Sequence, residues 1–147
     1  MIIENILLAL SPYMLFICLL GVTLGILWGA MPRLSTTMAM ALLIGLSATM
    51  DQYPAIMFML GVYTGSVFGG AISAVLINIP GTPDAVPTMI EGHTLARRGE
   101  GGLALGTAIA ASFMGNWVGI ILLIIFIPMI LLLALQFRSW EMFLLAM

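Results

Sequence analysis

The sequence predicts an all-α integral membrane protein, and three observations support this fold class. Hydrophobic residues make up 63% of the 147 residues, and charged residues make up only 7%. Soluble domains carry charges on about a quarter of their residues, so this chain could not cover a surface that faces water. The few charges also divide the sequence into long uncharged stretches, and several of these are long enough to cross a bilayer as helices.

Charge and cysteine content exclude several classes of protein. The net charge of −2 is too small for a nucleic-acid-binding domain or a polybasic membrane patch. The single cysteine, Cys18, excludes a disulfide within the chain. No basic residue precedes the first apolar stretch, so we expect that stretch to remain in the mature protein instead of being cleaved as a signal peptide.

We expect about four transmembrane or re-entrant helices in a single membrane domain over residues 1–147. Their predicted ranges are 13–31, 34–50, 55–79 and 103–127, with a polar connection at 80–102. Pro12 and Tyr13 mark the start of the first helix, and Pro32 ends it. Ser35, Thr36 and Thr37 are good N-cap candidates for the second helix. That helix is about 25 Å long, barely a span, so it could also be re-entrant.

The third and fourth helices follow from the positions of the remaining charges. After the polar turn Asp51–Pro54, the third segment is long enough to cross a hydrocarbon core of about 30 Å. The fourth uncharged stretch, residues 101–137, would reach about 55 Å as one helix. That is too long for one straight crossing, so we expect a kink or an end at Pro128.

Topology and length are inferred from the arginines and the C-terminal residues. The connections around residue 33 and at 80–102 hold three of the four arginines, which predicts that they face the cytoplasm and that the N-terminus lies outside. A further apolar run begins after Arg138 and stops at Met147, too short to span. This pattern predicts that the chain is a fragment or a truncated copy of a longer protein.

Small residues recur about every four positions in three of the predicted helices; two of these ladders are all glycine, and the third is Ala108, Ser112, Gly115 and Gly119. Small residues at this spacing let helix backbones approach closely in lipid. Two glycine ladders each lead toward a proline, a weak internal similarity that we do not interpret as a repeat. The residues predicted to pack helices are Gly21, Gly25, Gly29, Gly61, Gly65, Gly69, Gly115 and Gly119.

Hydroxyl groups and glycine share one face of the third predicted helix. Tyr63, Ser66, Gly70 and Ser73 project within an arc of roughly 80°, and Asn78 lies at the end of the helix. This face either bonds to a neighbouring helix or forms the wall of a path filled with water or solute. Its closeness to a helix break favours the path.

The break itself is the sequence Asn78–Pro83, which cannot continue a helix. Proline lacks an amide donor, and glycine permits backbone angles closed to other residues. Thr82 could cap a following helix, with Pro83 at its first position and Asp84 in its first turn. Thr88 and Glu91 also fit a capping box.

A helix that starts after Pro80 and Gly81 would expose free amides that attract anions. Broken helices of this kind often meet the solute in transporters. The alternative is an ordinary cap at the membrane interface, and the charge of Asp84 counts against an anion there. Together with the hydroxyl face, Pro80, Gly81 and Thr82 are therefore candidates for a solute path.

Arg33 is a further candidate, because its planar guanidinium suits a carboxylate and hydroxyl-rich residues follow it. Its alternative role is to anchor the chain at the membrane surface, as we expect of Arg97 and Arg98. His93 stands alone in the polar connection, without a second histidine or cysteine for a metal site. We find no catalytic constellation, so we expect neither an enzyme nor a metal centre.

The region from Tyr63 to Gly106 resembles the signature of the large permease subunit of tripartite tricarboxylate transporters, the TctA family. The similarity is close over about 60–106 and looser over 21–59 and 107–147. The positions that match the family pattern are Tyr63, Gly65, Gly69, Gly70, Asn78, Pro80, Gly81, Thr82, Gly92 and Gly99.

The chain departs from that pattern at three places. Arg33 and Ser35 stand where the family usually has glycine, which puts a first half-site in doubt. Glu91 replaces an aspartate, and His93 with Thr94 replaces a Tyr-Pro pair.

The resemblance implies the N-terminal part of a longer transporter of the inverted-repeat type in the bacterial inner membrane. It implies ion-gradient-driven carboxylate uptake, with Na+ or H+ as the coupling ion and no other cofactor. It also implies two partners, a small membrane subunit and a periplasmic solute-binding protein. The alternative is a small scaffolding membrane subunit, or a truncated copy that does not transport, in which the glycine ladders serve helix association alone.

Overall fold

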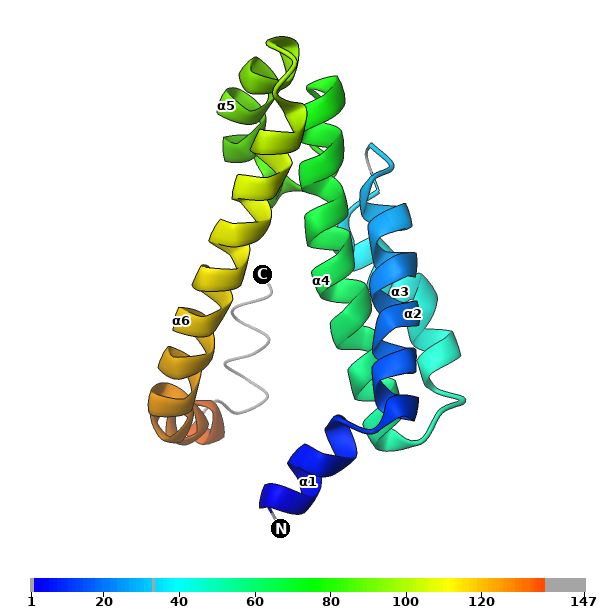
Figure 1. Cartoon of the computed structure of the whole chain (residues 1–147). Coiled ribbons are helices and arrows are strands. Elements are labelled where there is room, and N and C mark those ends of the chain that lie inside the picture. The colour runs from blue at the N-terminus through cyan, green and yellow to red at the C-terminus, as the bar shows by residue number, and fades with distance from the viewer. Residues whose placement is uncertain (1, 33, 137–147) are drawn as a thin grey trace. The chain divides into compact units, whose positions relative to one another are not determined.

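The computed structural model describes residues 2–32 and 34–136, and every regular element among them is helical (Figure 1). The elements are α1 (Ile2–Ala9), α2 (Pro12–Gly29), α3 (Thr36–Ser47), α4 (Gln52–Ile77), the 3₁₀ turn η1 (Pro83–Ala85), α5 (Val86–Arg97) and α6 (Gly101–Gln136). Among the described residues, α2, α4 and α6 are long and apolar enough to cross a membrane. The prediction of an all-α, multi-pass membrane protein is confirmed.

The chain divides into two compact units, Met1–Ile109 and Ala110–Met147. The first unit contains α1 to α5 together with the start of α6, and it holds the polar connection and the predicted break. The second unit contains the rest of α6, where the rings of Phe113 and Trp117 pack edge to face with centroids 6.3 Å apart.

Hydroxyl side chains begin α2 and α3, and of the two, Ser35 was among the predicted N-cap residues. Ser11 caps α2 by accepting the amide of Met14 (3.4 Å), with Pro12 at the first helical position. Ser35 caps α3 in the same way through the amide of Met38 (3.3 Å). With 12 residues, α3 is about 18 Å long, so it is too short to cross a hydrocarbon core of about 30 Å.

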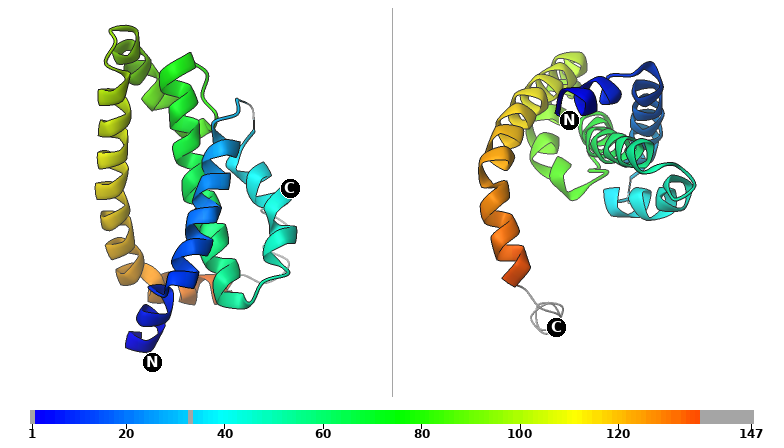
Figure 2. Two further views of the ribbon diagram at one scale, coloured as in Figure 1. Left: turned by 45° about the vertical axis from the view of Figure 1, so that its right-hand side comes forward. Right: turned by 90° about the horizontal axis from the view of Figure 1, so that it is seen from below.

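The structure adds α1, Ile2–Ala9, to the predicted helices. The polar connection 80–102 contains η1 and the 12-residue helix α5, which begins shortly after Thr82 as expected. In the second unit, α6 continues through Pro128 to Gln136, so of the predicted kink or end at Pro128, the end does not occur. The ribbon does change direction in its orange part (Figure 2), where proline cannot donate the regular amide hydrogen bond.

Helices α2 and α4 run parallel and pack along the two glycine ladders. Methyl groups placed on the α2 glycines would collide with carbonyl oxygens of α4, and methyl groups on the α4 glycines would collide with carbonyl oxygens of α2. The first set pairs Gly21, Gly25 and Gly29 with Phe58, Val62 and Ser66; the second pairs Gly61, Gly65 and Gly69 with Cys18, Val22 and Ile26. For Gly115 and Gly119, in the second unit, a packing role stays a prediction.

The two ladders are related by one constant offset in sequence. Gly21 corresponds to Gly61 forty positions later, and the N-caps Ser11 and Asp51 have the same separation. Each ladder therefore makes equivalent contacts with the other, which gives the helix pair an approximate twofold symmetry. The weak similarity visible in the sequence is a structural repeat of the α2 and α4 helices.

Apolar side chains complete this contact on one side. Ile17, Phe58 and Val62 are buried together with Ala39 of α3, and Trp28 packs against the cluster. Because α2 and α4 are parallel, the connections that follow them leave from the same end of the unit (Figure 1), as the topology prediction requires.

We predict that Gly25→Ala destabilises the protein, whereas Gly45→Ala does not. A methyl group at Gly25 meets backbone atoms of Val62 and Ser66, and such overpacking costs about 1–3 kcal/mol. A methyl group at Gly45 of α3 meets no atom within 4 Å. Thermal unfolding of the detergent-solubilised variants should show a lowered midpoint for Gly25→Ala alone; equal midpoints would contradict the packing described here.

Candidate functional site

After α4 the chain turns back along the helix it has just left. Asn78 ends α4 in the left-handed conformation (φ 57°, ψ 30°), which asparagine tolerates better than most residues. The amide of Gly81 then donates to the carbonyl of Gly70 (3.4 Å), seven residues before the end of α4. Residues 78–82, which we call the re-entrant segment, therefore reach back about 10 Å along the helix.

Three glycines allow this close return. A methyl group on Gly81 would collide with the carbonyl oxygen of Gly29 and would lie 2.8 Å from the Cα of Gly70 and 2.9 Å from Ser73 Oγ. A methyl group on Gly70 would lie 2.5 Å from Thr82 Oγ1. The tip of the segment thus fits between α2 and α4 only because these positions carry no side chain.

Thr82 brings an unpaired hydroxyl group into this contact. Its side chain is 2% exposed, and Oγ1 has no hydrogen-bond partner among the described residues. Thr82 does occupy the N-cap position of η1, with Pro83 and Asp84 following as predicted, but it makes no capping hydrogen bond. A buried unpaired polar group costs about 1–3 kcal/mol, so this hydroxyl is available to a ligand.

The second capping motif predicted from the sequence is wrong. Thr88 lies inside α5, which begins at Val86, so Thr88 and Glu91 do not form a capping box. The reason is that η1 leads directly into α5 and the helical chain has already started before Thr88 is reached.

The serines of the predicted hydroxyl face are buried and already paired. Ser66 Oγ donates to the carbonyl of Tyr63 (3.1 Å), and Ser73 Oγ donates to that of Gly70 (3.0 Å). Ser73 lies at the tip of the re-entrant segment. Ser66 lies about two turns earlier in α4, where its backbone contacts Gly29. Only the upper part of the predicted face therefore reaches the segment.

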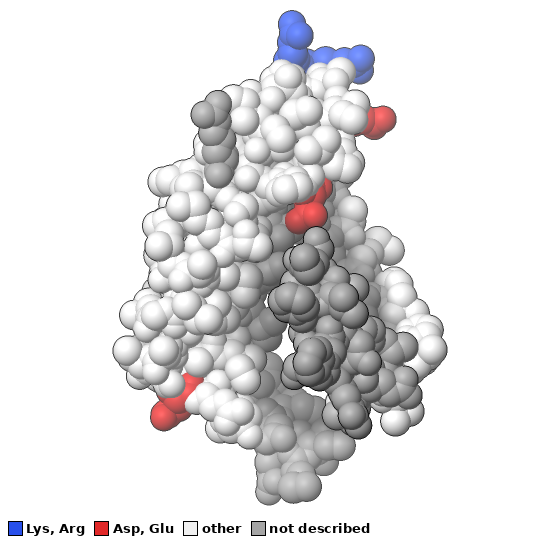
Figure 3. All heavy atoms as spheres, turned by 180° about the vertical axis from the view of Figure 1, so that it is seen from behind, with Lys and Arg blue, Asp and Glu red and all other residues white. Residues whose placement is uncertain are grey.

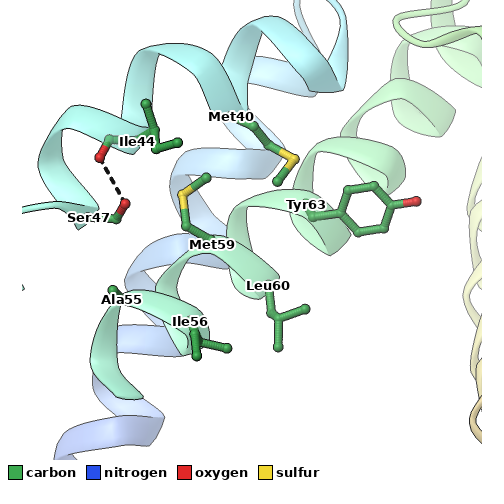
Figure 4. A pocket seen from close by; sticks show the side chains of 8 residues that line it. All are labelled: Met40, Ile44, Ser47, Ala55, Ile56, Met59, Leu60 and Tyr63. Atoms are coloured by element: carbon green, nitrogen blue, oxygen red, sulfur yellow. Dashed lines mark hydrogen bonds between the residues drawn. The ribbon is translucent and has the colours of Figure 1, made fainter. Parts of the chain in front are cut away.

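Tyr63 is separated from the other residues of that face. Its side chain is 49% exposed and lines a groove of about 400 Å³ between α3 and α4 (Figure 4). The other residues that line the groove are Met40, Ile44, Ser47, Ala55, Ile56, Met59 and Leu60. Tyr63 and Ser73 lie at opposite edges of the roughly 80° arc. The edge with Tyr63 packs near α3, and the edge with Ser73 contacts the re-entrant segment.

The remaining candidates fall into three groups. Asn78 is exposed at the start of the segment, and Pro80 is half-buried next to its tip. Arg33 lies outside the described residues, as does the predicted run after Arg138. Gly29, to which the sequence analysis gave only a packing role, contacts Gly81 directly. Its position as the last glycine before Pro32 is the signal that could have revealed this contact.

The re-entrant segment, η1 and α5 together fold back along α4, and we call this unit the re-entrant hairpin. His93 joins α5 to α4, a contact that sequence reasoning missed. Its Nδ1 hydrogen-bonds the carbonyl of Val75 in α4 (3.0 Å). Next to it, a methyl group on Gly92 would lie 2.7 Å from Val75 Cγ2, so α5 and α4 are in close contact here.

Charged side chains lie at the surface around this hairpin. Asp84, Arg97 and Arg98 are exposed, and the two arginines are the blue atoms in Figure 3, at the end of α5. Within the described part of the chain, no three His, Cys, Asp or Glu side chains gather as metal ligands. The groups that surround the tip of the segment are neutral hydroxyl and backbone groups.

Comparison with known proteins identifies the relatives of this chain. The profile of the tripartite tricarboxylate transporter TctA family matches residues 15–147. A 52.8 kDa protein from the TAR-I ttuC' 3' region of Agrobacterium vitis is 36% identical over 135 residues, which is 92% of this chain and 27% of the relative. The chain thus spans about a quarter of the length of that relative. No solved structure matches.

We predict that Thr82→Val leaves the stability of the protein unchanged or raises it. Valine has nearly the same shape as threonine and removes a buried hydroxyl that lacks a partner. Ser73→Ala, which removes a paired hydroxyl, should lower the thermal midpoint. A midpoint that falls more for Thr82→Val than for Ser73→Ala would show that the Thr82 hydroxyl is already bonded.

Proposed function

Because the chain belongs to the tripartite tricarboxylate transporter TctA family, we propose that it forms part of a permease that takes up carboxylates. The proposed system is a secondary transporter in the bacterial inner membrane, driven by an ion gradient. Its proposed partners are a small membrane subunit and a periplasmic solute-binding protein. The family match supports the class of solute, and three apolar helices among the described residues support a place in the membrane.

The observation that carries the proposal for this chain is the re-entrant segment. Irregular backbone is tolerated at membrane depth only where it is buried in protein or lines a cavity, and transporters use broken helices to meet their solute. The segment breaks a membrane helix and reaches about 10 Å back along it, with the Thr82 hydroxyl unpaired at its tip.

Thr82 offers two groups that suit a carboxylate. Its amide nitrogen and its Oγ1 face the same side, 2.9 Å and 2.5 Å from a methyl group placed on Gly70. Both groups can donate hydrogen bonds, and donors to an ionised carboxylate form stronger bonds than neutral pairs do. We therefore assign Thr82, with Gly70, Ser73, Pro80 and Gly81 around it, to the solute path. Small movements of the segment would admit the solute.

As coupling ion we propose Na+ or H+. The two are distinguished by measuring uptake at constant pH with Na+ replaced by choline, and then at constant Na+ with the proton gradient collapsed by an uncoupler. Loss of uptake in the first experiment assigns Na+, and loss in the second assigns H+.

A scaffolding role is the second candidate, and the close α2 and α4 contact favours it. Glycine ladders of this kind serve helix association in membranes without any transport. In that case the re-entrant segment would tolerate any substitution that preserves folding. The same variants therefore discriminate between the two functions.

In the full-length transporter, we predict that Gly81→Leu abolishes uptake of citrate and related carboxylates. A leucine side chain at this position collides with Gly29 and forces the tip away from α4. Thr82→Val should fold normally and reduce uptake roughly ten- to a hundredfold, since one hydrogen bond to a charged group is worth about 1.5–3 kcal/mol. Radiolabelled uptake into proteoliposomes measures both.

The matched control is Gly45→Leu, because Gly45 has open space around it. It should transport at the unmodified rate. Uptake of every tested carboxylate at the unmodified rate by both Gly81→Leu and Thr82→Val would contradict the site assignment and favour the scaffolding role.

A further inference from the structure

Two contacts hold the re-entrant hairpin, and they lie at different levels of α4. At the tip, the Gly81 amide donates to the carbonyl of Gly70 (3.4 Å). One and a half turns further along, His93 Nδ1 bonds the carbonyl of Val75 (3.0 Å). Since Thr82 lies beside Gly70 and His93 beside Val75, α5 runs parallel to α4 between the two contacts.

The His93 bond satisfies a backbone group that the helix break leaves unpaired. A carbonyl oxygen can only accept, so Nδ1 carries the hydrogen and donates it to Val75. In a continuous helix, the amide of residue 79 would bond this carbonyl, but α4 ends at Ile77. Loss of the imidazole would leave the Val75 carbonyl without this partner at a site that is partly buried.

The His93 contact is also the firmer of the two. Its length is that of a standard hydrogen bond, whereas 3.4 Å at the tip is beyond the usual range for an amide and a carbonyl. Gly92 lets α5 approach Val75 closely, so the position of α5 along α4 is fixed at this level.

We propose that His93 is a positioning residue for the solute path, in that its Nδ1–H bond to Val75 sets how far Thr82 reaches along α4. The inference rests on the proposed function, because it assigns to Thr82 the contact with solute. His93 itself does not touch the solute. The link between the two residues is the rigid stretch formed by η1 and the first two turns of α5.

Side-chain amides can test which ring nitrogen matters. The amide nitrogen of asparagine takes nearly the position of Nδ1, and that of glutamine takes the position of Nε2. In the full-length protein, His93→Asn should therefore keep the bond to Val75, whereas His93→Gln and His93→Leu should lose it. Thr94→Val is the matched control, because the Thr94 hydroxyl bonds only within its own helix, to Ile90.

The first measurement is the rate at which N-ethylmaleimide modifies Thr82→Cys in a full-length background in which Cys18 and every other native cysteine are replaced by alanine, so that residue 82 carries the sole thiol. With His93 intact or replaced by asparagine, modification should be slow, because residue 82 is 2% exposed. His93→Gln and His93→Leu should accelerate it roughly five- to a hundredfold, the factor that corresponds to a lost buried hydrogen bond. Modification of Ser66→Cys, at a fully buried residue about two turns earlier in α4 than Ser73, should stay slow in every His93 variant.

The second measurement is the KM for citrate uptake with Thr82 intact. The variants should group as they do in the modification experiment: His93→Gln and His93→Leu should raise the KM, and His93→Asn and Thr94→Val should leave it unchanged. Equal modification rates across all His93 variants would overturn the inference, and so would rescue by glutamine in place of asparagine. If the modification rates follow the prediction but no variant transports citrate or a related carboxylate, the proposed function fails while the positioning role stands.

Discussion

The structure depends on one constraint, namely that a chain that ends an apolar helix and turns back along it must find partners within the protein for its backbone groups. The end of α4 at Ile77 leaves its last carbonyls without helical partners. The chain meets this need by folding back on itself, with Gly81 against Gly70 at the tip and His93 against Val75 further along. The absence of side chains at Gly29, Gly70 and Gly81 makes the return possible. Among the described residues around the tip, the Thr82 hydroxyl stays buried and unpaired after this arrangement.

The glycine ladders and the break belong to one continuous arrangement. The ladders bring α2 and α4 into contact along their lengths, and the last α2 glycine, Gly29, meets both Ser66 of α4 and the tip of the re-entrant segment. Helix packing thus positions the candidate site, because any separation of α2 from α4 would remove the wall against which Gly81 rests. The short helix α3 supports the same pair from one side without spanning the bilayer.

Sequence reasoning could predict the membrane class, the capping serine Ser35 and the break at Asn78–Pro83, because each is encoded by local composition. It could not predict which residues the break would meet. Tyr63 and Ser73 share a helix face in the sequence, but the position of α3 separates them. Likewise, His93 has no local motif, and its role becomes visible only once α5 is known to lie along α4. At Pro128 a kink or an end was predicted, and the helix continues through it, since proline removes one hydrogen bond without stopping a long apolar helix.

The measurement that tests the central claim most directly is an experimental structure of the full-length protein in a lipid nanodisc, at a resolution that shows side chains. The account predicts that α4 stops at Ile77 and that Gly81 lies against Gly70 and Gly29, shielded from lipid. A helix that continues without interruption through residues 76–86, or a segment 78–82 that faces only acyl chains, would contradict it.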